Sequence, residues 1–304
     1  MSKWLGYSIL AIFLQGIWSL VAAMASRSLS PYLVQVLSTA GLIPLAVVLA
    51  FSPNLRSGAN RRRGMGFAAG CGLVGGTGNI ALYAALNSGG PASMVFPLTG
   101  MFPLVTVILA RWLLHEKMSG VQWTGMGLAM LAICLFSIVP GEGIPVGART
   151  LAPWMAFSLL ALALFGAACI GQKFATMYIS DELSMICFTV ASLPLAAGIA
   201  PFVKDWSFTW KDGTLSALSG FFMGSSTLVL FFAFRWGKAS LVTPLAALYP
   251  LVTVLLAVPI LNERLDGLKI AAIVLALVAA LALGAESASA GRKALPVVDH
   301  LKED

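Results

Sequence analysis

Apolar residues run along this chain in ten long stretches that are separated by short polar connections. Within a stretch they follow one another without the alternation that marks a strand of a membrane barrel. A helix needs about 20 apolar residues to cross the hydrocarbon core of a bilayer. We therefore predict transmembrane helices at 4–25, 31–51, 64–87, 91–113, 119–139, 152–178, 182–203, 213–236, 239–261 and 265–284.

Composition also places the chain in a membrane. Of its 304 residues, 59% are hydrophobic and 10% are charged, and the mean hydropathy is +0.91. Soluble domains are about 45–50% apolar and about 25% charged. The first stretch is longer than the core of a signal peptide and lacks a clear cleavage site, so we expect it to remain as a span. Residues 287–304 are polar and are predicted to form a disordered cytoplasmic tail.

The basic residues predict how the spans are oriented. The net charge of +7 does not indicate a nucleic-acid partner, because the dense basic cluster at 56–63 lies in a short loop between two apolar stretches. With the N-terminus in the cytoplasm, 13 of the 19 Lys and Arg residues fall on the cytoplasmic side. The positive-inside rule then predicts a multi-pass protein of the cell (inner) membrane with both termini in the cytoplasm.

Cysteine and glycine patterns point to helix packing. The four cysteines stand alone in apolar stretches, so we predict no metal site and no cofactor. The third stretch contains GMGFAAGCGLVGGTGN, but no strand precedes these glycines as it would in a dinucleotide-binding fingerprint. We interpret Gly66/Gly70 and Gly72/Gly76 as small-residue pairs that let helices approach closely.

Two distant segments are nearly the same: FPLTGMFPLVTVILARWLLHE at 96–116 and TPLAALYPLVTVLLAVPILNE at 243–263. At a constant offset of 147, 15 of 29 positions are identical from Ala92/Ala239 to Gly120/Gly267. A weaker offset of 150 relates the first and sixth stretches. We therefore predict a duplication, with one five-helix repeat at 1–145 and a second at 146–286.

The number of helices in each repeat determines how the repeats are related. Because five is odd, the second repeat enters the membrane from the opposite side, so the two are inverted. Inverted repeats are common in alternating-access transporters, whose site lies near the midplane. The predicted fold is an all-α integral membrane bundle of ten transmembrane helices, formed by two inverted five-helix repeats around a central cavity.

Two prolines six residues apart occur in both repeats: Pro97 and Pro103 in the first, Pro244 and Pro250 in the second. Proline has no N–H, so the carbonyl four residues earlier loses its helical partner. Within a bilayer that carbonyl needs another donor, such as a hydroxyl or water. We expect these prolines to kink two helices that border a wet central space; the alternative is a kink that serves packing alone.

Each proline-rich run ends in a similar way, with LLHEKMSGVQWTG in the first repeat and ILNERLDGLK in the second. With ten helices in two halves, the pattern resembles the EamA-type branch of the drug/metabolite transporter superfamily over about residues 4–284. The resemblance implies a bundle with a central cavity. It also implies export or exchange of small organic solutes, amino acids among them.

Polar and aromatic side chains at mid-depth are candidates for a substrate site, because an amide or phenol loses free energy when it faces lipid. Single rings have the alternative role of anchors at the membrane interface. Gln15 and Trp18 are three residues apart, and Asn79 and Tyr83 are four apart, so each pair shares a helix face. Ser226 is the counterpart of Asn79 at the offset of 147. The predicted substrate-binding residues are Gln15, Trp18, Asn79, Tyr83, Thr99, Gln172, Ser226 and Tyr249.

Charged groups near the spans are interpreted as structural. Glu116 and Glu263 end matching helices and precede the helix-starting Ser119 and Asp266, so we favour loop ordering over gating. Lys173 lies close enough to the predicted cytoplasmic end to snorkel, although it has the charge to pair with a substrate carboxylate or phosphate. No Asp or Glu falls at mid-depth, which argues against proton coupling through one buried carboxylate.

These patterns predict a secondary transporter, an exporter or exchanger of small organic metabolites that works by alternating access. Its partners are a small-molecule solute and membrane lipid, and it is a monomer or a homodimer. The alternative is a channel or membrane sensor built from a duplicated helical bundle. An enzyme is not predicted, because His115 and His300 lie at an interface and in the tail, and no catalytic pair falls at mid-depth.

Overall fold

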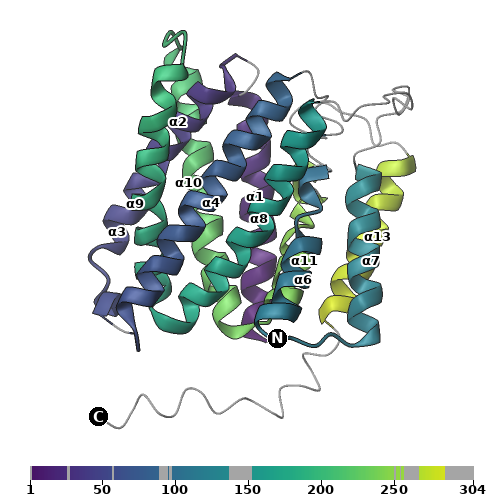
Figure 1. Ribbon diagram of the computed structural model, residues 1–304. Helices are drawn as coiled ribbons and strands as arrows, with labels where there is room; N and C mark the ends of the chain where they lie inside the picture. The colour runs from purple at the N-terminus through teal and green to yellow at the C-terminus, as the bar shows by residue number, and fades with distance from the viewer. Residues whose placement is uncertain are drawn as a thin grey trace.

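The computed structural model describes residues 2–25, 28–56, 58–88, 95, 98–136, 153–249, 251–253, 255–256 and 267–284, and there its regular structure is helical throughout (Figure 1). The long helices stand side by side as a bundle. They are α1 (Lys3–Ala25), α2 (Pro31–Gly41), α3 (Ile43–Leu49), α4 (Arg61–Asn87), α6 (Pro103–Leu113), α7 (Gly120–Phe136), α8 (Pro153–Tyr178), α9 (Asp181–Ile199), α10 (Trp210–Trp236), α11 (Ala239–Ala246) and α13 (Gly267–Gly284), with 3₁₀ turns at Pro53–Arg56 and Ala200–Phe202.

Every predicted apolar range contains helix in the described residues. Six helical segments are long and apolar enough to cross a membrane: Lys3–Ala22, Pro31–Leu49, Arg61–Ala85, Pro153–Tyr178, Asp181–Phe202 and Trp210–Trp236. Shorter apolar helices occupy Leu98–Leu113, Ala239–Thr253 and Ile270–Ala279. The all-α membrane fold is confirmed, and the count of ten full spans stays a prediction.

Three of the predicted spans are interrupted near prolines. The second divides at Leu42, just before Pro44, into α2 and α3. In the fourth, α6 begins at Pro103 after a turn at 101–102, and proline suits this first position because its N–H is not needed there. The ninth contains Pro244 within α11 and turns at 247–248. Pro97 and Pro250 lie outside the described residues.

Helix caps extend the duplication to the second and seventh spans, which sequence identity did not reveal. The Ser30 hydroxyl accepts the backbone N–H of Leu33 at the start of α2, and the Ser180 hydroxyl accepts that of Leu183 at the start of α9. Ser30 and Ser180 are 150 residues apart. The same offset relates Pro44 to Pro194, the proline inside α9.

Equivalent close contacts join the two repeats. A Cβ added at Gly16 of α1 would lie 2.5 Å from Val252 Cβ, and one added at Gly166 of α8 would lie 2.5 Å from Val105 Cβ. Each contact joins the first helix of one repeat to the fourth helix of the other. The offsets of 150 and 147 convert one contact into the other, so the backbone follows the duplication at these junctions.

The same junctions carry equivalent hydrogen bonds. The Thr106 hydroxyl donates to the Gly166 carbonyl at 3.2 Å, and the Thr253 hydroxyl donates to the Gly16 carbonyl at 3.4 Å. In Figure 1, α1 starts at the end of the bundle that holds the N-terminus, whereas its counterpart α8 runs toward that end. The two repeats are therefore inverted with respect to each other.

The repeats interlock. Helix α1 lies along α10, α4 lies along α8, and α7 packs against α13. Each of these pairs takes one helix from each repeat, so the sequence repeats are not separate bodies in space.

Glycines permit two further close contacts. A Cβ added at Gly72 of α4 would lie 2.6 Å from the Phe188 carbonyl oxygen of α9, and one added at Gly220 of α10 would lie 1.7 Å from the Ser38 carbonyl oxygen of α2. Ser38 and Phe188 are 150 residues apart, so the two contacts are counterparts. Gly72 of α4 and Gly220 of α10 are therefore equivalent, which sets the offset between these two helices at 148.

Only one of the two predicted glycine pairs lies at a helix contact. A Cβ at Gly72 or Gly76 would meet α9, the latter at 2.5 Å from Leu195 Cδ1. Among the described residues, a Cβ at Gly66 or Gly70 would meet nothing within 4 Å. The prediction for Gly66 and Gly70 was wrong, because a four-residue spacing does not say which face of a helix meets another.

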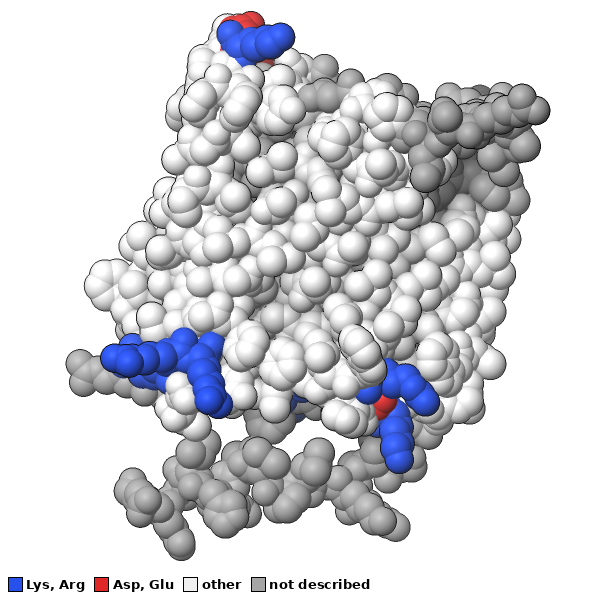
Figure 2. All heavy atoms as spheres, viewed as in Figure 1, with Lys and Arg blue, Asp and Glu red and all other residues white. Residues whose placement is uncertain are grey.

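Charge is concentrated at the two ends of the bundle (Figure 2). We call the end at which α1 begins the N-face. Among the described residues, the helix order places these basic residues at the N-face: Lys3, Arg56, Arg61, Arg62, Arg63, Arg111, Lys117, Arg235 and Lys238. Lys204 and Lys211 lie at the opposite end, and the band between the two ends is white in Figure 2.

Candidate functional site

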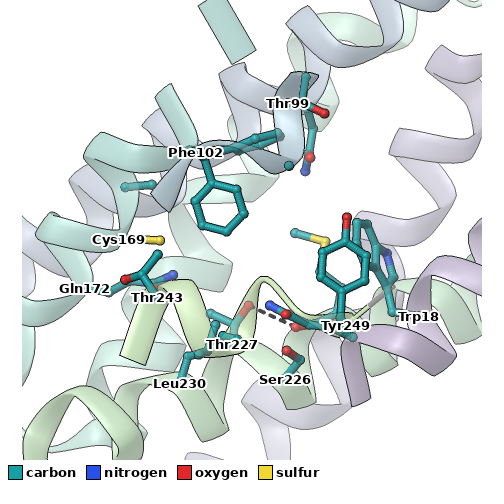
Figure 3. Close-up of a pocket in the computed structure, with 18 of the residues that line it drawn as sticks. Trp18, Thr99, Phe102, Cys169, Gln172, Ser226, Thr227, Leu230, Thr243 and Tyr249 are labelled. Atoms are coloured by element: carbon teal, nitrogen blue, oxygen red, sulfur yellow. Dashed lines mark hydrogen bonds between the residues drawn. The ribbon is translucent and has the colours of Figure 1, made fainter. Parts of the chain in front are cut away.

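A central cavity of about 150 Å³ lies where helices of both repeats meet (Figure 3). Its walls come from α1, α4, α8, α9, α10 and α11 and from the segment that leads into α6. The fourth and ninth spans, which are interrupted at 101–102 and 247–248, therefore contribute wall residues at or beside their breaks.

Seven of the eight predicted substrate-binding residues line this cavity: Gln15, Trp18, Asn79, Thr99, Gln172, Ser226 and Tyr249. The eighth, Tyr83, does not. It packs against a cluster of buried apolar residues that includes Leu82 of α4 and Ala161 of α8. Sharing a face of α4 with Asn79 was not enough to bring Tyr83 to the cavity, because α4 packs along α8 there.

The offset of 148 changes one predicted equivalence. It matches Asn79 to Thr227, and not to Ser226 as the offset of 147 suggested. Both Ser226 and Thr227 line the cavity. One offset therefore does not hold for the whole repeat: 150 applies to the first two helices, 148 to the third and 147 to the fourth.

Many wall residues occur as counterparts from the two repeats. In six pairs both members line the cavity and differ in chemistry: Gln15/Phe165, Trp18/Ala168, Gly75/Met223, Asn79/Thr227, Thr99/Ala246 and Phe102/Tyr249. The cavity thus lies at the centre of the duplicated arrangement, while its two sides present different chemical groups.

Aromatic residues at the helix breaks meet rings on the first helix of the other repeat. Tyr249 lies next to Trp18 of α1, with ring centroids 6.2 Å apart and planes at 58°. Phe102 lies next to Phe165 of α8, with centroids 6.4 Å apart and planes at 77°. These four rings give the cavity apolar, flat surfaces.

Four polar oxygens in the walls have no hydrogen-bond partner among the described residues. They are Gln15 Oε1, Gln172 Oε1, Ser226 Oγ and Thr243 Oγ1, and all four are buried atoms. A buried polar group left unpaired costs about 1–3 kcal/mol. Because their residues line the cavity, rotation of these side chains would bring the oxygens to water or a bound solute that can supply the missing partners.

The described walls hold no Lys, Arg, Asp, Glu or His. Recognition there depends on amides, hydroxyls and rings. Figure 3 shows Gln172 and Thr243 on one side of the space and Trp18 with Tyr249 on the other. In the described part of the chain, no three His, Cys, Asp or Glu residues are grouped so that they could hold a metal ion.

One of the carbonyls expected to be freed by proline has a local partner. The N–H of Phe102 donates to the Thr99 carbonyl at 3.1 Å, in the turn just before Pro103. The Thr99 hydroxyl donates to the Val95 carbonyl at 2.8 Å. The Thr99 carbonyl is therefore paired without water, although Thr99 and Phe102 still border the cavity.

Lys173 does not line the cavity. Its Nζ donates to the carbonyls of Phe234 and Gly237, at 2.5 and 2.7 Å. These carbonyls are at the C-terminal end of α10, where a helix leaves acceptors unpaired. Lys173 thus caps α10, a role that differs from both the snorkelling and the substrate-pairing interpretation.

Glu116 also differs from its predicted role. Ser119 does start α7, since Ser119 and Gln122 exchange reciprocal hydrogen bonds at 3.0 and 3.3 Å. Glu116, however, does not order this helix start. Its carboxylate accepts hydrogen bonds from Ala239 and Ser240 of α11, in the other repeat. Glu263 lies outside the described residues.

Sequence reasoning missed several wall residues, among them Phe102, Cys169, Thr227 and Thr243. Two had a signal in the chain: Phe102 is the counterpart of Tyr249 at the offset of 147, and Cys169 is one turn before Gln172. Thr227 required the offset of 148, which the helix contacts alone establish.

Comparison with known proteins agrees with this arrangement. The model of the EamA-like transporter family matches the chain twice, over residues 2–138 and 152–285. Among solved structures 29 chains match. One, described only as the crystal structure of a protein, superimposes with a TM-score of 0.77 at 16% identity, covering 95% of this chain and 98% of that one. No curated protein sequence matches.

Proposed function

The chain belongs to the EamA-like transporter family, and from this we propose that it is an exporter or exchanger of small organic metabolites that works by alternating access. The observation that carries the proposal is the central cavity, whose walls contain matched residues from both inverted repeats. In transporters built from inverted repeats, the substrate site lies where the repeats meet near the midplane.

The walls support a solute with no net charge and with two unlike ends. A solute with a net charge would lose its hydration without gaining an opposite charge from the described walls, which is costly, whereas the two charges of a zwitterion partly offset each other within the solute. The unpaired oxygens of Gln172 and Thr243 accept N–H or O–H donors, and the rings of Trp18 and Tyr249 suit a flat apolar group. Neutral, zwitterionic amino acids, including aromatic ones, fit this description.

We also propose that the N-face is cytoplasmic, in the cell (inner) membrane. The described basic residues are concentrated there, and both ends of the chain were predicted on that side. Reaction of single cysteines placed at Lys3 and Lys204 with an impermeant reagent tests this. In intact cells the cysteine at Lys204 should react and the one at Lys3 should not, and the reverse pattern would contradict the orientation.

Counterflow in proteoliposomes tests the transport proposal. Vesicles are loaded with one unlabelled amino acid and supplied with a trace of the same labelled compound, for a panel of neutral, acidic and basic amino acids. We expect labelled neutral amino acids to accumulate transiently above equilibrium, and aspartate and lysine to remain at the level of protein-free vesicles.

A matched variant connects the flux to the cavity. Gln172→Leu removes the unpaired amide and keeps a similar volume, so we expect it to lower the rate about tenfold or more. If neutral amino acids show no counterflow while the protein is folded and inserted, the amino-acid proposal is wrong. Flux that does not saturate and shows no counterflow would point to the channel alternative.

A further inference from the structure

We infer that Glu116 is a gate-positioning residue: its carboxylate holds α11 in place and so keeps the cavity closed toward the N-face. The inference rests on the proposed transport function, because it assigns a role in the transport cycle. Glu116 belongs to the first repeat, and it caps the N-terminal end of α11, which belongs to the second.

Both oxygens of the Glu116 carboxylate accept hydrogen bonds from α11. Glu116 Oε1 accepts the N–H of Ala239 at 2.9 Å. Glu116 Oε2 accepts the N–H of Ser240 at 2.9 Å and the hydroxyl of Ser240 at 2.7 Å. These N–H groups are at the N-terminal end of α11, where a negative charge is favourable.

The cap comes from outside the helix and its repeat. The residue at the N-cap position of α11 is Lys238, whose side chain makes no capping hydrogen bond. Lys238 Nζ donates instead to the Lys117 carbonyl at 3.0 Å, next to Glu116. A helix capped by its own residue keeps its cap when it moves. Helix α11 would lose this one whenever it moved away from the Glu116 segment.

Helix α11 lies where a gate is needed. All eight of its residues are buried. Thr243 and Ala246 line the cavity, whereas Ala239 and Ser240, about 6 Å earlier along the axis, are bound by Glu116. The helix therefore runs from the Glu116 contact at the N-face to the cavity wall, and it is followed by a turn at 247–248 that can serve as a hinge.

A second group fixes the entry to α11. Lys173 binds the carbonyls of Phe234 and Gly237, and Gly237 directly precedes Lys238. Phe234 also lines the cavity. The C-terminal end of α10 is thus held from α8, directly before the residues that enter α11.

The sequence repeats this pair of residues. At the offset of 147, Glu116 corresponds to Glu263 and Ser240 to Ser93. Both counterparts lie outside the described residues. The repetition of the pair is expected for a device that the inverted repeats use in turn.

A native cysteine reports the opening of this gate without any substrate. Cys169 lines the cavity and is buried. In a background in which Cys71, Cys134 and Cys187 are alanine, an impermeant thiosulfonate applied at the N-face, in vesicles of known orientation, modifies Cys169 only when that side opens. The full-length protein is used, and no solute needs to be identified.

Glu116→Gln keeps the shape and removes the charge, so the hydrogen bonds from α11 weaken. We expect modification of Cys169 from the N-face to become about tenfold faster, the difference between a charged and a neutral hydrogen-bond acceptor. Ser240→Ala removes one donor of the three and should give a smaller increase in the same direction. Glu182→Gln is the matched control, since Glu182 is a carboxylate at the same face that accepts from Asn54.

Three outcomes would overturn the inference. One is an unchanged rate from the N-face in both folded variants. Another is an equal increase from the two faces, which indicates general loosening and not a gate. The third is an equal increase in Glu182→Gln. The inference stands apart from the transport assay: a faster reaction from the N-face supports the gate even if the tested amino acids prove to be the wrong solutes.

Discussion

The junctions between the repeats and the walls of the cavity are built from the same duplicated helices, yet they have diverged to different degrees. At the junctions, Gly16 and Gly166 each meet a valine and each accept a threonine hydroxyl. In the walls, Gln15 is matched by Phe165 and Asn79 by Thr227. A close helix contact accepts only the smallest side chain, whereas a cavity wall accepts any side chain that water or solute can satisfy.

The largest expected effect is at two close contacts between helix backbones. Gly220→Ala places a Cβ 1.7 Å from a backbone oxygen of α2, and Gly72→Ala places one 2.6 Å from a backbone oxygen of α9. Since backbone cannot rotate away, we expect each to lower the free energy of unfolding by about 2–4 kcal/mol, with Gly220→Ala the worse. Thermal denaturation in detergent, followed by size-exclusion chromatography, measures this.

Gly70→Ala is the control on the same helix as Gly72. A Cβ there meets nothing within 4 Å, and alanine favours helix over glycine by about 1 kcal/mol. We expect it to be neutral or slightly stabilising. Equal melting temperatures for Gly70→Ala and Gly72→Ala would show that the α4–α9 contact is not as close as described.

The second prediction compares two residues of α4, Asn79 in the cavity wall and Tyr83 in the packing between helices. Asn79→Leu removes an amide that lines the cavity, so we expect transport of the correct solute to fall about tenfold or more with normal expression. Tyr83→Leu changes a ring that packs on α8, so it should lower thermal stability and leave the transport rate within about threefold. If the two variants lost transport equally, Tyr83 would have to be counted among the substrate-binding residues.

The third prediction tests whether the two junctions are equivalent. Gly16→Ala and Gly166→Ala each bring a Cβ within 2.5 Å of a valine Cβ, and we expect each to cost about 1–3 kcal/mol. Val252→Ala should restore part of the loss in the first, and Val105→Ala in the second. The melting temperatures of the singles and doubles give the coupling, and simple additivity at either junction would contradict the contact there.

The smallest effect concerns the hydroxyls at the same junctions. Thr106→Val and Thr253→Val keep the shape and remove the hydroxyl that reaches a glycine carbonyl. Thr253→Val also removes a hydrogen bond with Ser19 Oγ at 2.6 Å. We expect a loss of about 0.5–1.5 kcal/mol in each, with the larger loss at Thr253. Shifts in chemical denaturation at both junctions would support the duplication at the level of single side chains, and a shift at one junction alone would break the equivalence.

The fold was largely predictable because its causes are local in the sequence. Apolar stretches of membrane length give the helices, and the repeated segment with Pro103 and Pro250 gives the duplication and its inverted orientation. Most of the candidate wall was predictable for a related reason, since a polar side chain such as Gln172 at mid-depth must avoid lipid.

Other features depend on how helices rotate and shift against one another, which identity along the chain does not encode. Tyr83 and Asn79 share a helix face, yet only Asn79 reaches the cavity. The pairing of Asn79 with Thr227 needed the backbone contacts of α4 and α10. The role of Glu116 was hidden because its partners are in the other repeat, 123 and 124 residues away.

The interlocking of the repeats has a consequence for biosynthesis. Helix α1 leaves the ribosome long before α10, the helix along which it lies, has been made. At about 5–20 residues per second, the delay is roughly 10 to 40 s. During that time the polar side chains of the first five helices must be sheltered by lipid headgroups, by each other or by the insertion machinery. The contacts between α1 and α10 therefore form only after most of the second repeat has been synthesised.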